Sequence, residues 1–393
     1  MIVIRGGRVL TRDGLRPVDV VVDGGIVTAL GSARDSGAAS VIDATGCLVG
    51  PGFVDIHTHL RDPGQTWKED LESGSRAAAA GGFTAITSMP NTDPPLDEPK
   101  LLTDVLERGI EIGLVDIGVA AAVTRGRAGD ELAPLEELYD AGARIFTDDG
   151  DTVRAPGLFS EALDRLLRLP GAVLAQHAEP EETIVRRDLA LVAETGGRYH
   201  CQHVSSADTV ELIRRAREAG LAVTAEVTPH HLSFDRDVAA PDDPNFKMYP
   251  PLRSAEDRRE LIEGLAGGVI GVVATDHAPH TEEEKHVAWD AAPRGVIGLE
   301  TAASAVWQAL GGDPLRLFEV LSTGPARIAG LPEQGLPVDV GARANLVVFD
   351  PAASWSPHGF LSRSVNSPYL GRSMLGRSVA TIYRGRITQR VDR

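Results

Sequence analysis

Two histidines, His57 and His59, lie one residue apart at the end of a short apolar run that begins at Phe53. The run follows a Pro-Gly break and is typical of a buried strand. Alternate residues of a strand face the same side, so the two imidazoles point in one direction from its carboxyl end. Paired imidazoles on one face are typical of a zinc site, although two surface histidines would give the same spacing.

Further groups that bind metals lie at the ends of later apolar runs. They are Asp148, Asp149, His177, His203 and Asp276. Each group alone has an ordinary explanation, because a single histidine is often a satisfied core residue and a pair of aspartates often forms a turn or a helix N-cap. Together, four histidines, Asp276 and one of the two neighbouring aspartates at strand ends predict a site for one or two zinc ions with a bound water.

Strand-like and helix-like segments alternate through the middle of the chain. The strand-like runs are 53–56, 83–88, 114–119, 143–147, 172–176, 199–204, 222–227 and 269–275. Helix-like stretches lie between them, and several end at a glycine such as Gly81, Gly109 or Gly196. This alternation predicts an α/β fold, a (β/α)8 TIM-type barrel, whose chemistry lies at the carboxyl ends of the strands. A doubly wound open sheet is the alternative, although no glycine-rich phosphate loop follows an early strand.

Both ends of the chain are rich in short strand-like runs. Those at the start cover 2–10, 18–22, 26–30 and 41–49, and those at the end cover 345–349 and 379–383. We therefore predict a small β-sandwich domain formed from both termini, with residues 1–50 plus 335–393, and a barrel domain of residues 51–334.

The composition excludes several classes of protein. The 393 residues are 42% apolar and 24% charged, which argues against disorder, and no apolar run is long enough to span a membrane. The net charge of −17 argues against nucleic acid or an anionic membrane as a partner. Two cysteines, Cys47 and Cys201, give no disulfide framework, and the chain starts without a signal-peptide pattern, so we expect a cytoplasmic protein.

The stretch 52–61 resembles the opening motif of the amidohydrolase superfamily. Five further stretches resemble type I dihydroorotase: 88–92 (SMPNT), 146–150 (FTDDG), 226–232 (EVTPHHL), 274–281 (ATDHAPHT) and 298–301 (GLET). The similarity extends over nearly the whole chain. It implies reversible hydrolysis of dihydroorotate to N-carbamoyl-L-aspartate in pyrimidine biosynthesis, with one or two Zn2+ per chain. It also implies a homodimer, and leaves association with aspartate carbamoyltransferase open.

The resemblance assigns roles to individual residues. The implied metal ligands are His57, His59, Asp149, His177, His203 and Asp276. Asp149 is preferred over Asp148 as the bridging carboxylate from the family's spacing, and Asp276 would also be the catalytic base and then acid. The residues implied to bind substrate are His59, Arg61, Asn91, Tyr249, His280, Arg294 and Gly295. Arg61, Asn91 and His280 would hold the substrate carboxylate, for which the planar guanidinium fork is well shaped.

Relatives that act on other cyclic amides use a carboxylated lysine at the end of the fourth barrel strand. None of the four lysines (Lys68, Lys100, Lys247 and Lys285) falls there, which favours dihydroorotase. An inactive dihydroorotase-like scaffold subunit is a further alternative, but such proteins typically lose ligand residues and here every position is filled.

Three departures from the family pattern concern the substrate. The family carries a longer loop after Glu179, whereas this chain continues at once into Pro180, so we expect a segment to be missing from the printed sequence rather than truly deleted. Tyr249 stands where an asparagine usually precedes two prolines, and Arg294 stands in place of a phenylalanine. These changes leave open a hydantoinase-like or allantoinase-like substrate.

Overall fold

The computed structural model describes residues 1–32, 40–238 and 243–391. Eight strands form its centre: β8 (Phe53–Thr58), β9 (Phe83–Ser88), β10 (Asp116–Val119), β11 (Ile145–Phe146), β12 (Val173–Gln176), β13 (Tyr199–Cys201), β14 (Val223–Val227) and β15 (Val272–Val273). They form two parallel sheets, β10-β9-β8 and β11-β12-β13-β14-β15. Each strand lies within or overlaps a run predicted from the sequence, although β11 and β15 are only two residues long.

Two parallel bridges join these sheets into a closed ring. Ala121 bridges to Phe146 on one side, and Thr58 bridges to His277 on the other. Backbone hydrogen bonds support both bridges, including one of 2.8 Å from His59 N to the His277 carbonyl. The predicted (β/α)8 barrel is therefore confirmed.

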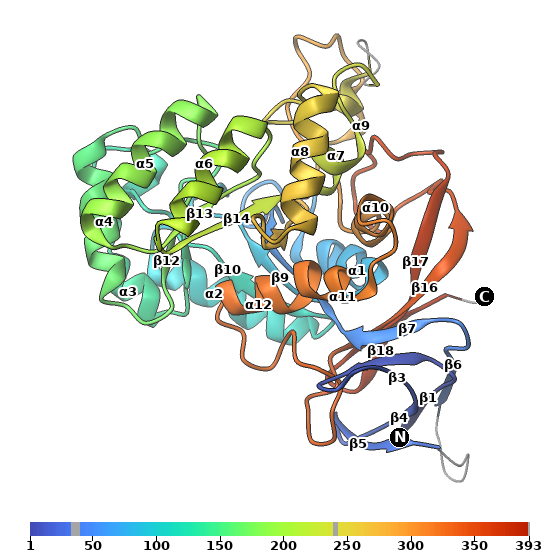
Figure 1. Ribbon diagram of the computed structural model, residues 1–393. Coiled ribbons are helices and arrows are strands. Elements are labelled where there is room, and N and C mark those ends of the chain that lie inside the picture. The colour runs from blue at the N-terminus through green and yellow to red at the C-terminus, as the bar shows by residue number, and fades with distance from the viewer. Residues whose placement is uncertain (33–39, 239–242, 392–393) are drawn as a thin grey trace.

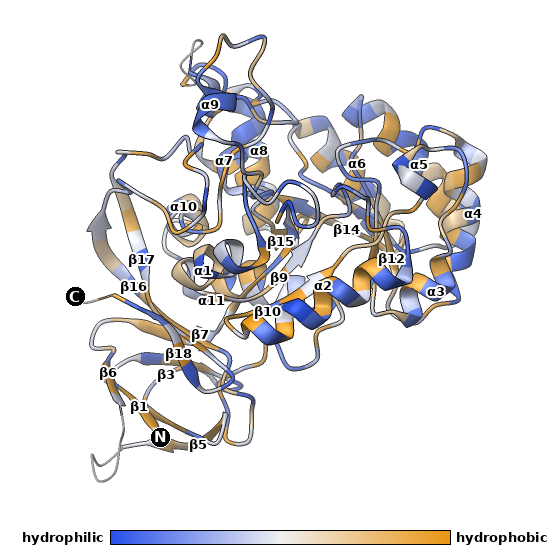
Figure 2. Cartoon of the chain, turned by 180° about the vertical axis from the view of Figure 1, so that it is seen from behind, coloured by the Kyte–Doolittle hydropathy of each residue, from blue (hydrophilic) through white to orange (hydrophobic). Residues whose placement is uncertain are grey.

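Helices surround the barrel (Figure 1). They are α1 (Leu71–Gly81), α2 (Pro99–Ile112), α3 (Leu135–Asp140), α4 (Pro156–Leu167), α5 (Glu181–Thr195), α6 (Ala207–Glu218), α7 (Pro229–Ser233), α8 (Ala255–Ala266), α9 (Glu282–Lys285), α10 (Ala302–Ala309), α11 (Pro314–Phe318) and α12 (Gly324–Ile328), with single turns η1 (Arg125–Arg127), η2 (Pro244–Phe246) and η3 (Glu319–Thr323). The helices α2, α4 and α6 carry hydrophilic and hydrophobic residues together (Figure 2). In α4 the buried residues Phe159, Ala162, Leu163 and Leu166 recur at helical spacing, so one face packs inward.

Strands from both ends of the chain lie together below the barrel (Figure 1). One sheet has the order β5-β4-β1-β6, and the other has the order β18-β17-β16-β7-β2-β3. Their bounds are β1 (Ile2–Arg5), β2 (Arg8–Thr11), β3 (Gly14–Pro17), β4 (Asp19–Asp23), β5 (Ile26–Gly31), β6 (Ser40–Asp43), β7 (Leu48–Pro51), β16 (Leu346–Trp355), β17 (Met374–Tyr383) and β18 (Arg386–Arg390). Buried residues of both sheets, among them Val20 and Val348, share one core. The β-sandwich formed from both termini is thus confirmed, while its exact residue limits stay a prediction.

The connection between β12 and α5 is short. The chain runs from His177 through Ala178 and Glu179 to Pro180, and α5 begins at the next residue. Glu181, the first residue of α5, accepts hydrogen bonds from the backbone amides of Ser205 and Ser206, both at 3.1 Å. The helix start is therefore tied directly to the neighbouring strand end, and the expectation of a missing segment stays a prediction.

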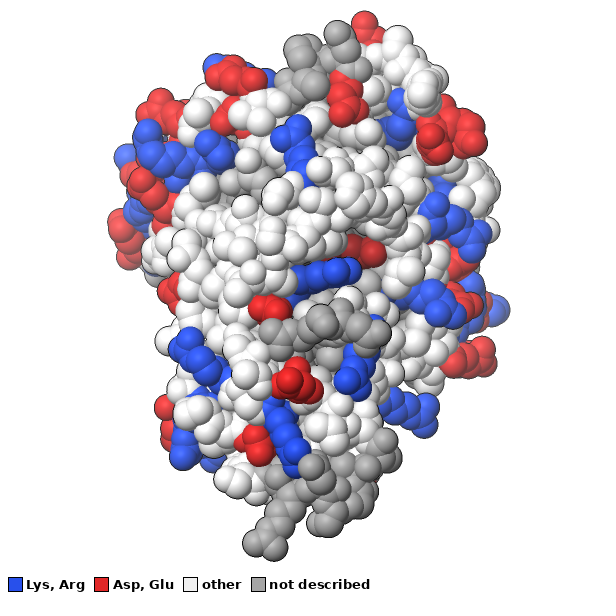
Figure 3. Space-filling model, turned by 90° about the vertical axis from the view of Figure 1, so that its right-hand side faces the viewer, with Lys and Arg blue, Asp and Glu red and all other residues white. Residues whose placement is uncertain are grey.

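Charged side chains of both signs are interspersed on the face shown in Figure 3. That face has no wide area of a single sign, so the net charge of −17 is not concentrated on it. Among the described residues, no helix has the length and apolar character needed to cross a membrane.

Gly82 lies where the barrel packs closely against the β domain. It ends α1 with φ +97°, and a Cβ there would lie 2.5 Å from Ser378 Oγ, 2.8 Å from Val347 Cγ2 and 2.9 Å from Phe53 Cδ2. We expect Gly82→Ala to lower the free energy of unfolding by roughly 1–2 kcal/mol through backbone strain and by a further 1–3 kcal/mol through overpacking.

Gly196 is a matched control, because it ends α5 with φ +71° and has open space at its Cβ position. Gly196→Ala should show only the backbone cost when both variants are unfolded in urea. Equal losses for the two variants would contradict the packing argument.

Candidate metal centre

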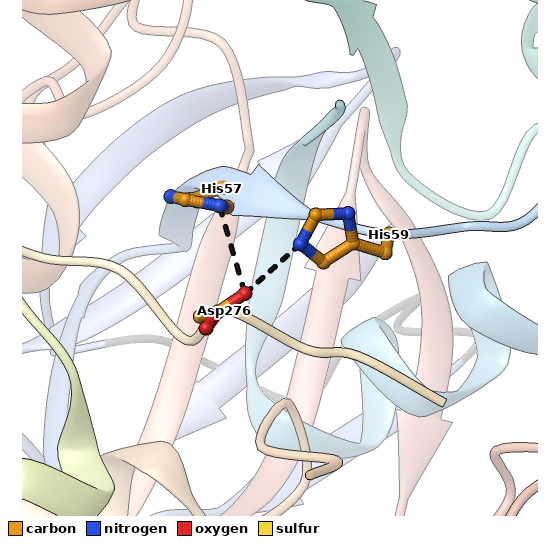
Figure 4. A group of neighbouring side chains, drawn as sticks. All are labelled: His57, His59 and Asp276. Atoms are coloured by element: carbon orange, nitrogen blue, oxygen red, sulfur yellow. Dashed lines mark hydrogen bonds and ion pairs between the residues drawn. The ribbon is translucent and has the colours of Figure 1, made fainter. Parts of the chain in front are cut away.

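Imidazoles and carboxylates meet at the carboxyl ends of the barrel strands. His57 is the residue before the last of β8, His59 directly follows β8, and Asp276 follows β15. Figure 4 shows Asp276 facing both rings, with its Oδ1 2.9 Å from His59 Nε2 and 3.6 Å from His57 Nε2. The closure of the barrel between β8 and β15 is therefore what brings these three groups together.

Asp149 lies at the centre of a second group of imidazoles. Its Oδ2 is 3.3 Å from His57 Nε2 and 3.4 Å from His59 Nε2. Its Oδ1 is 3.3 Å from His203 Nε2 and 3.6 Å from His177 Nδ1. The two oxygens of one carboxylate thus face two different pairs of histidines, which is the arrangement that a carboxylate shared by two cations would require.

The donor atoms fit a bound cation. In each of two trios, His57 with His59 and Asp276, and His57 with Asp149 and His203, the donor atoms all lie within 4.8 Å of one another. His57 Nε2 is buried and makes no hydrogen bond, although buried polar atoms are normally paired. A mixed set of imidazole nitrogens and carboxylate oxygens is typical of zinc and related divalent metals.

The electrostatics also favour a cation. Burial alone would raise the pKa of Asp149, but His57, His177 and His203 hold it well below its usual value. Burial likewise opposes ionisation of Asp276, yet His59 and His57 lower its pKa to about 2. Both carboxylates therefore present negative charge to the centre of the cluster.

Asp148 is directed away from the cluster. Its Oδ1 accepts hydrogen bonds from the backbone amides of Val123 at 2.9 Å and Thr124 at 3.1 Å, and its Oδ2 accepts one from the Thr124 hydroxyl. Asp148 thereby ties the end of β11 to the segment that follows β10. The structure places Asp149, and not Asp148, among the histidines.

Three of the predicted site residues have a strained backbone. Arg61, His203 and Asp276 have φ values of 59°, 31° and 48°, although none of them is glycine. Only two other described non-glycine residues share this conformation, so the strain is concentrated at the strand ends around the cluster. Such conformations cost of order 1–3 kcal/mol each and persist where the surroundings enforce them.

The residues predicted to bind substrate surround the cluster. Asn91 Oδ1 accepts a hydrogen bond from His59 Nδ1 at 2.8 Å, which leaves His59 Nε2 free to face the carboxylates. Arg61 Nε donates to the Pro279 carbonyl at 3.2 Å, and burial lowers the pKa of Arg61 to about 10, so it stays charged at neutral pH. Burial, and then the charges of Arg61 and Lys68, lower the pKa of His280 to about 3, so this imidazole is neutral.

Tyr249, Arg294 and Gly295 form one wall beside the cluster. The Tyr249 ring lies 4.8 Å from the His177 ring, and the Arg294 guanidinium lies 4.1 Å above the Tyr249 ring. Gly295 has φ +129°, and a Cβ there would lie 2.8 Å from the Ala278 Cβ and 3.2 Å from His280 Nε2. The backbone passes too close to these groups for any other residue at position 295.

Sequence reasoning missed several residues that hold the site in place. Asp55 accepts hydrogen bonds from the Thr275 amide and hydroxyl and from the His57 amide, which ties β8 to the residue before Asp276. Its position two residues before His57, on the same side of the strand, is a signal that the sequence offers. Lys68 adds positive charge near His280, and nothing in its local sequence indicates this.

The barrel and the strand-end cluster define an amidohydrolase, a hydrolase that acts on a cyclic amide. Family models agree, because residues 46–188 match the dihydro-orotase-like family and residues 170–381 match the amidohydrolase family. The protein named dihydroorotase from Mycobacterium tuberculosis is 43% identical to this chain, and the alignment covers 96% of this chain and 97% of the relative. The protein of the same name from Pelotomaculum thermopropionicum is 39% identical, and the alignment covers 98% of each chain. This chain belongs to the dihydroorotase family.

Solved structures with the same fold include hydantoinases. The L-hydantoinase from Arthrobacter aurescens superposes with a TM-score of 0.88 at 28% identity, covering 99% of this chain and 96% of that one. The dihydropyrimidinase from Brevibacillus agri gives 0.85 at 26% identity, covering 99% and 95%. The alignment with the Mycobacterium tuberculosis relative spans 420 positions, more than the 393 residues of this chain, so that relative contains residues that are absent here.

The two neighbouring aspartates should respond differently to the same substitution. We expect Asp149→Asn to lose bound metal, because the carboxylate charge between the histidine pairs is removed. Asp148→Asn should keep the metal and instead lower the free energy of unfolding by about 1–3 kcal/mol, since its hydrogen bonds are structural. Metal content after dialysis, measured by atomic emission beside urea unfolding, distinguishes the two, and metal loss in Asp148→Asn alone would reverse the assignment.

Proposed function

We propose that this chain is a zinc-dependent dihydroorotase, which interconverts dihydroorotate and N-carbamoyl-L-aspartate in pyrimidine biosynthesis. The ligands we assign are His57, His59, Asp149, His177, His203 and Asp276, for one or two Zn2+. The observation that carries the proposal is the position of the Asp149 carboxylate between two pairs of imidazoles. It occurs in a chain that is 39–43% identical to dihydroorotases over nearly its whole length.

Different side chains would bind zinc, transfer the proton and orient the histidines during hydrolysis. When zinc is bound, it lowers the pKa of water from about 16 to about 7 and polarises a carbonyl. Asp276 accepts the proton of the attacking water on its carboxylate and then donates it to the ring nitrogen as the amide bond breaks. In the direction of ring closure, Asp276 takes a proton from that nitrogen. Asn91 and Glu226 hold His59 and His57 through their Nδ1 atoms, so that Nε2 of each ring faces the reacting centre.

The substrate carboxylate has a separate place beside the cluster. Arg61 supplies a planar pair of donors, and His280 is a neutral imidazole next to it. Lys68 contributes further positive charge, which Glu284 partly balances at 3.0 Å. We assign the ring of the substrate to the wall made by Tyr249, Arg294 and Gly295.

A related cyclic amide is the second candidate substrate. Tyr249 and Arg294 make a stacked wall over His177, and the solved structures with this fold carry the names of hydantoinases and a dihydropyrimidinase. The end of β11 carries Thr147, Asp148 and Asp149 and no lysine, which is why we favour dihydroorotate.

The setting of the enzyme is also a proposal. We expect a homodimer in the cytoplasm, where the thiols of the two buried cysteines would remain reduced. Association with aspartate carbamoyltransferase is tested by mixing the two purified proteins and measuring their combined mass.

Activity of the zinc-loaded protein tests the proposed function directly. We expect hydrolysis of dihydroorotate and cyclisation of N-carbamoyl-L-aspartate, with little turnover of hydantoin, dihydrouracil or allantoin. Asp276→Asn should lower kcat by roughly 100- to 10,000-fold, because the base is removed. Turnover of hydantoin, dihydrouracil or allantoin without dihydroorotate would contradict the assignment.

Tyr249 allows a test of the substrate wall. Removing the ring in Tyr249→Ala takes away the platform beneath Arg294, worth about 0.5–2 kcal/mol, so we expect KM for dihydroorotate to rise roughly twofold to thirtyfold with a smaller change in kcat. Tyr249→Phe is the control, since it keeps the stack and removes only the hydroxyl. A loss in Tyr249→Phe as large as that in Tyr249→Ala would show that the hydroxyl matters and the ring does not. Steady-state kinetics on the three proteins decide between these results.

A further inference from the structure

Glu226 lies beneath the metal centre, in the interior of the barrel. It belongs to β14, is 1% exposed, and reaches two histidines with its two oxygens. Oε1 is 2.6 Å from His57 Nδ1, and Oε2 is 3.0 Å from His200 Nε2. Because β15 lies between β14 and β8 in the barrel, the contact with His57 spans the interior and is not a contact between neighbouring strands.

The contact determines which nitrogen of His57 carries the proton. A carboxylate oxygen only accepts, so His57 Nδ1 must be protonated and must donate to Glu226. With Nδ1 protonated, Nε2 is the nitrogen that faces Asp149 and Asp276, at 3.3 Å and 3.6 Å, and it makes no hydrogen bond, so a ring that binds a cation through Nε2 keeps its proton on Nδ1. This is the tautomer that a metal ligand needs.

His200 is bound to the same carboxylate in a different way. Its Nε2 donates to Glu226, and its Nδ1 lies 2.8 Å from the Thr224 hydroxyl, so both ring nitrogens have partners within the protein. His200 therefore anchors the second oxygen of Glu226 without facing the cluster. Oε1 also lies 3.3 Å from the backbone amide of His203.

We propose that Glu226 is a positioning residue of the metal centre, which fixes the tautomer and orientation of His57 and strengthens His57 Nε2 as a ligand. The inference rests on the zinc site proposed above. Carboxylates in this position typically change metal affinity by 10- to 100-fold. The alternative is a purely structural role, in which Glu226 only links β8, β13 and β14.

Zinc affinity of the apo-protein separates the two roles. We expect Glu226→Gln to weaken zinc binding by 10- to 100-fold in competition with a chromophoric chelator, because the negative acceptor behind His57 is lost. The absorption spectrum of the Co2+-loaded protein should also change, since it reports the ligands around the metal.

His200→Gln is the matched control, because it removes the partner of the other oxygen and leaves the contact with His57 in place. This control should keep zinc affinity within about threefold, while both apo-variants lose stability in urea. Equal weakening of zinc binding in the two variants would support the structural role and overturn the proposal.

Zinc binding by the unmodified protein distinguishes failure of the zinc site from failure of the positioning role of Glu226. If the unmodified protein binds zinc and Glu226→Gln binds it equally well, the positioning role is overturned and the zinc site stands. If the unmodified protein binds no zinc, both proposals fail. Should Glu226→Gln not fold, Glu226→Asp keeps the charge but shortens the side chain, and an unchanged zinc affinity in that variant would equally overturn the positioning role.

Discussion

The carboxylates of Asp149 and Asp276 are buried at one mouth of the barrel, and a buried negative charge is stable only when positive charge or strong donors surround it. Removing an ionised carboxylate from water costs several kcal/mol, even after the protein relaxes around it. Imidazoles offset part of this cost, which is why the pKa of each carboxyl lies below its usual value despite burial. A divalent cation among the same donor atoms would offset much more of this desolvation cost. The surrounding structure holds the donor atoms of each trio within 4.8 Å of one another, so a cation could contact all three.

The arrangement depends on how the barrel closes. The ligands come from strands far apart in the sequence, and the gap between β8 and β15 is closed by few backbone contacts. Asp55 reinforces that closure from inside, because it receives donors from both sides of the seam. Asn91 contacts Nδ1 of His59, just after β8, and Glu226 contacts Nδ1 of His57, within β8. The ligand positions thus depend on residues that do not face the cluster themselves, as is usual where metals are bound.

The sequence predicted what local patterns encode. The apolar runs predicted the eight strands, and the glycines that follow the helices supported the order of the elements. The residues at the strand ends predicted six possible metal ligands, which the structure brings together. The preference for Asp149 over Asp148 rested on the family's spacing alone, because adjacent aspartates have the same chemistry and the donors that hold Asp148 come from the distant segment at Val123. The sequence could not decide the origin of the short connection after Glu179, because surface connections tolerate deletion and loop length in a family does not constrain one member.

The net charge of the chain does not predict the charge of the substrate that the site would bind. The chain carries −17 overall, yet Arg61 and Lys68 lie beside a neutral His280 next to the cluster. In the proposed reaction, opening the ring converts one carbonyl into a carboxylate, while the second carboxylate of the molecule is unchanged. In this proposal the histidines and aspartates surround the ring carbonyl that becomes a carboxylate. Arg61 and Lys68 bind the carboxylate that does not change. A substrate bound the wrong way round would leave the charges of Arg61 and Lys68 without an anionic partner, and the loss of those interactions would disfavour it.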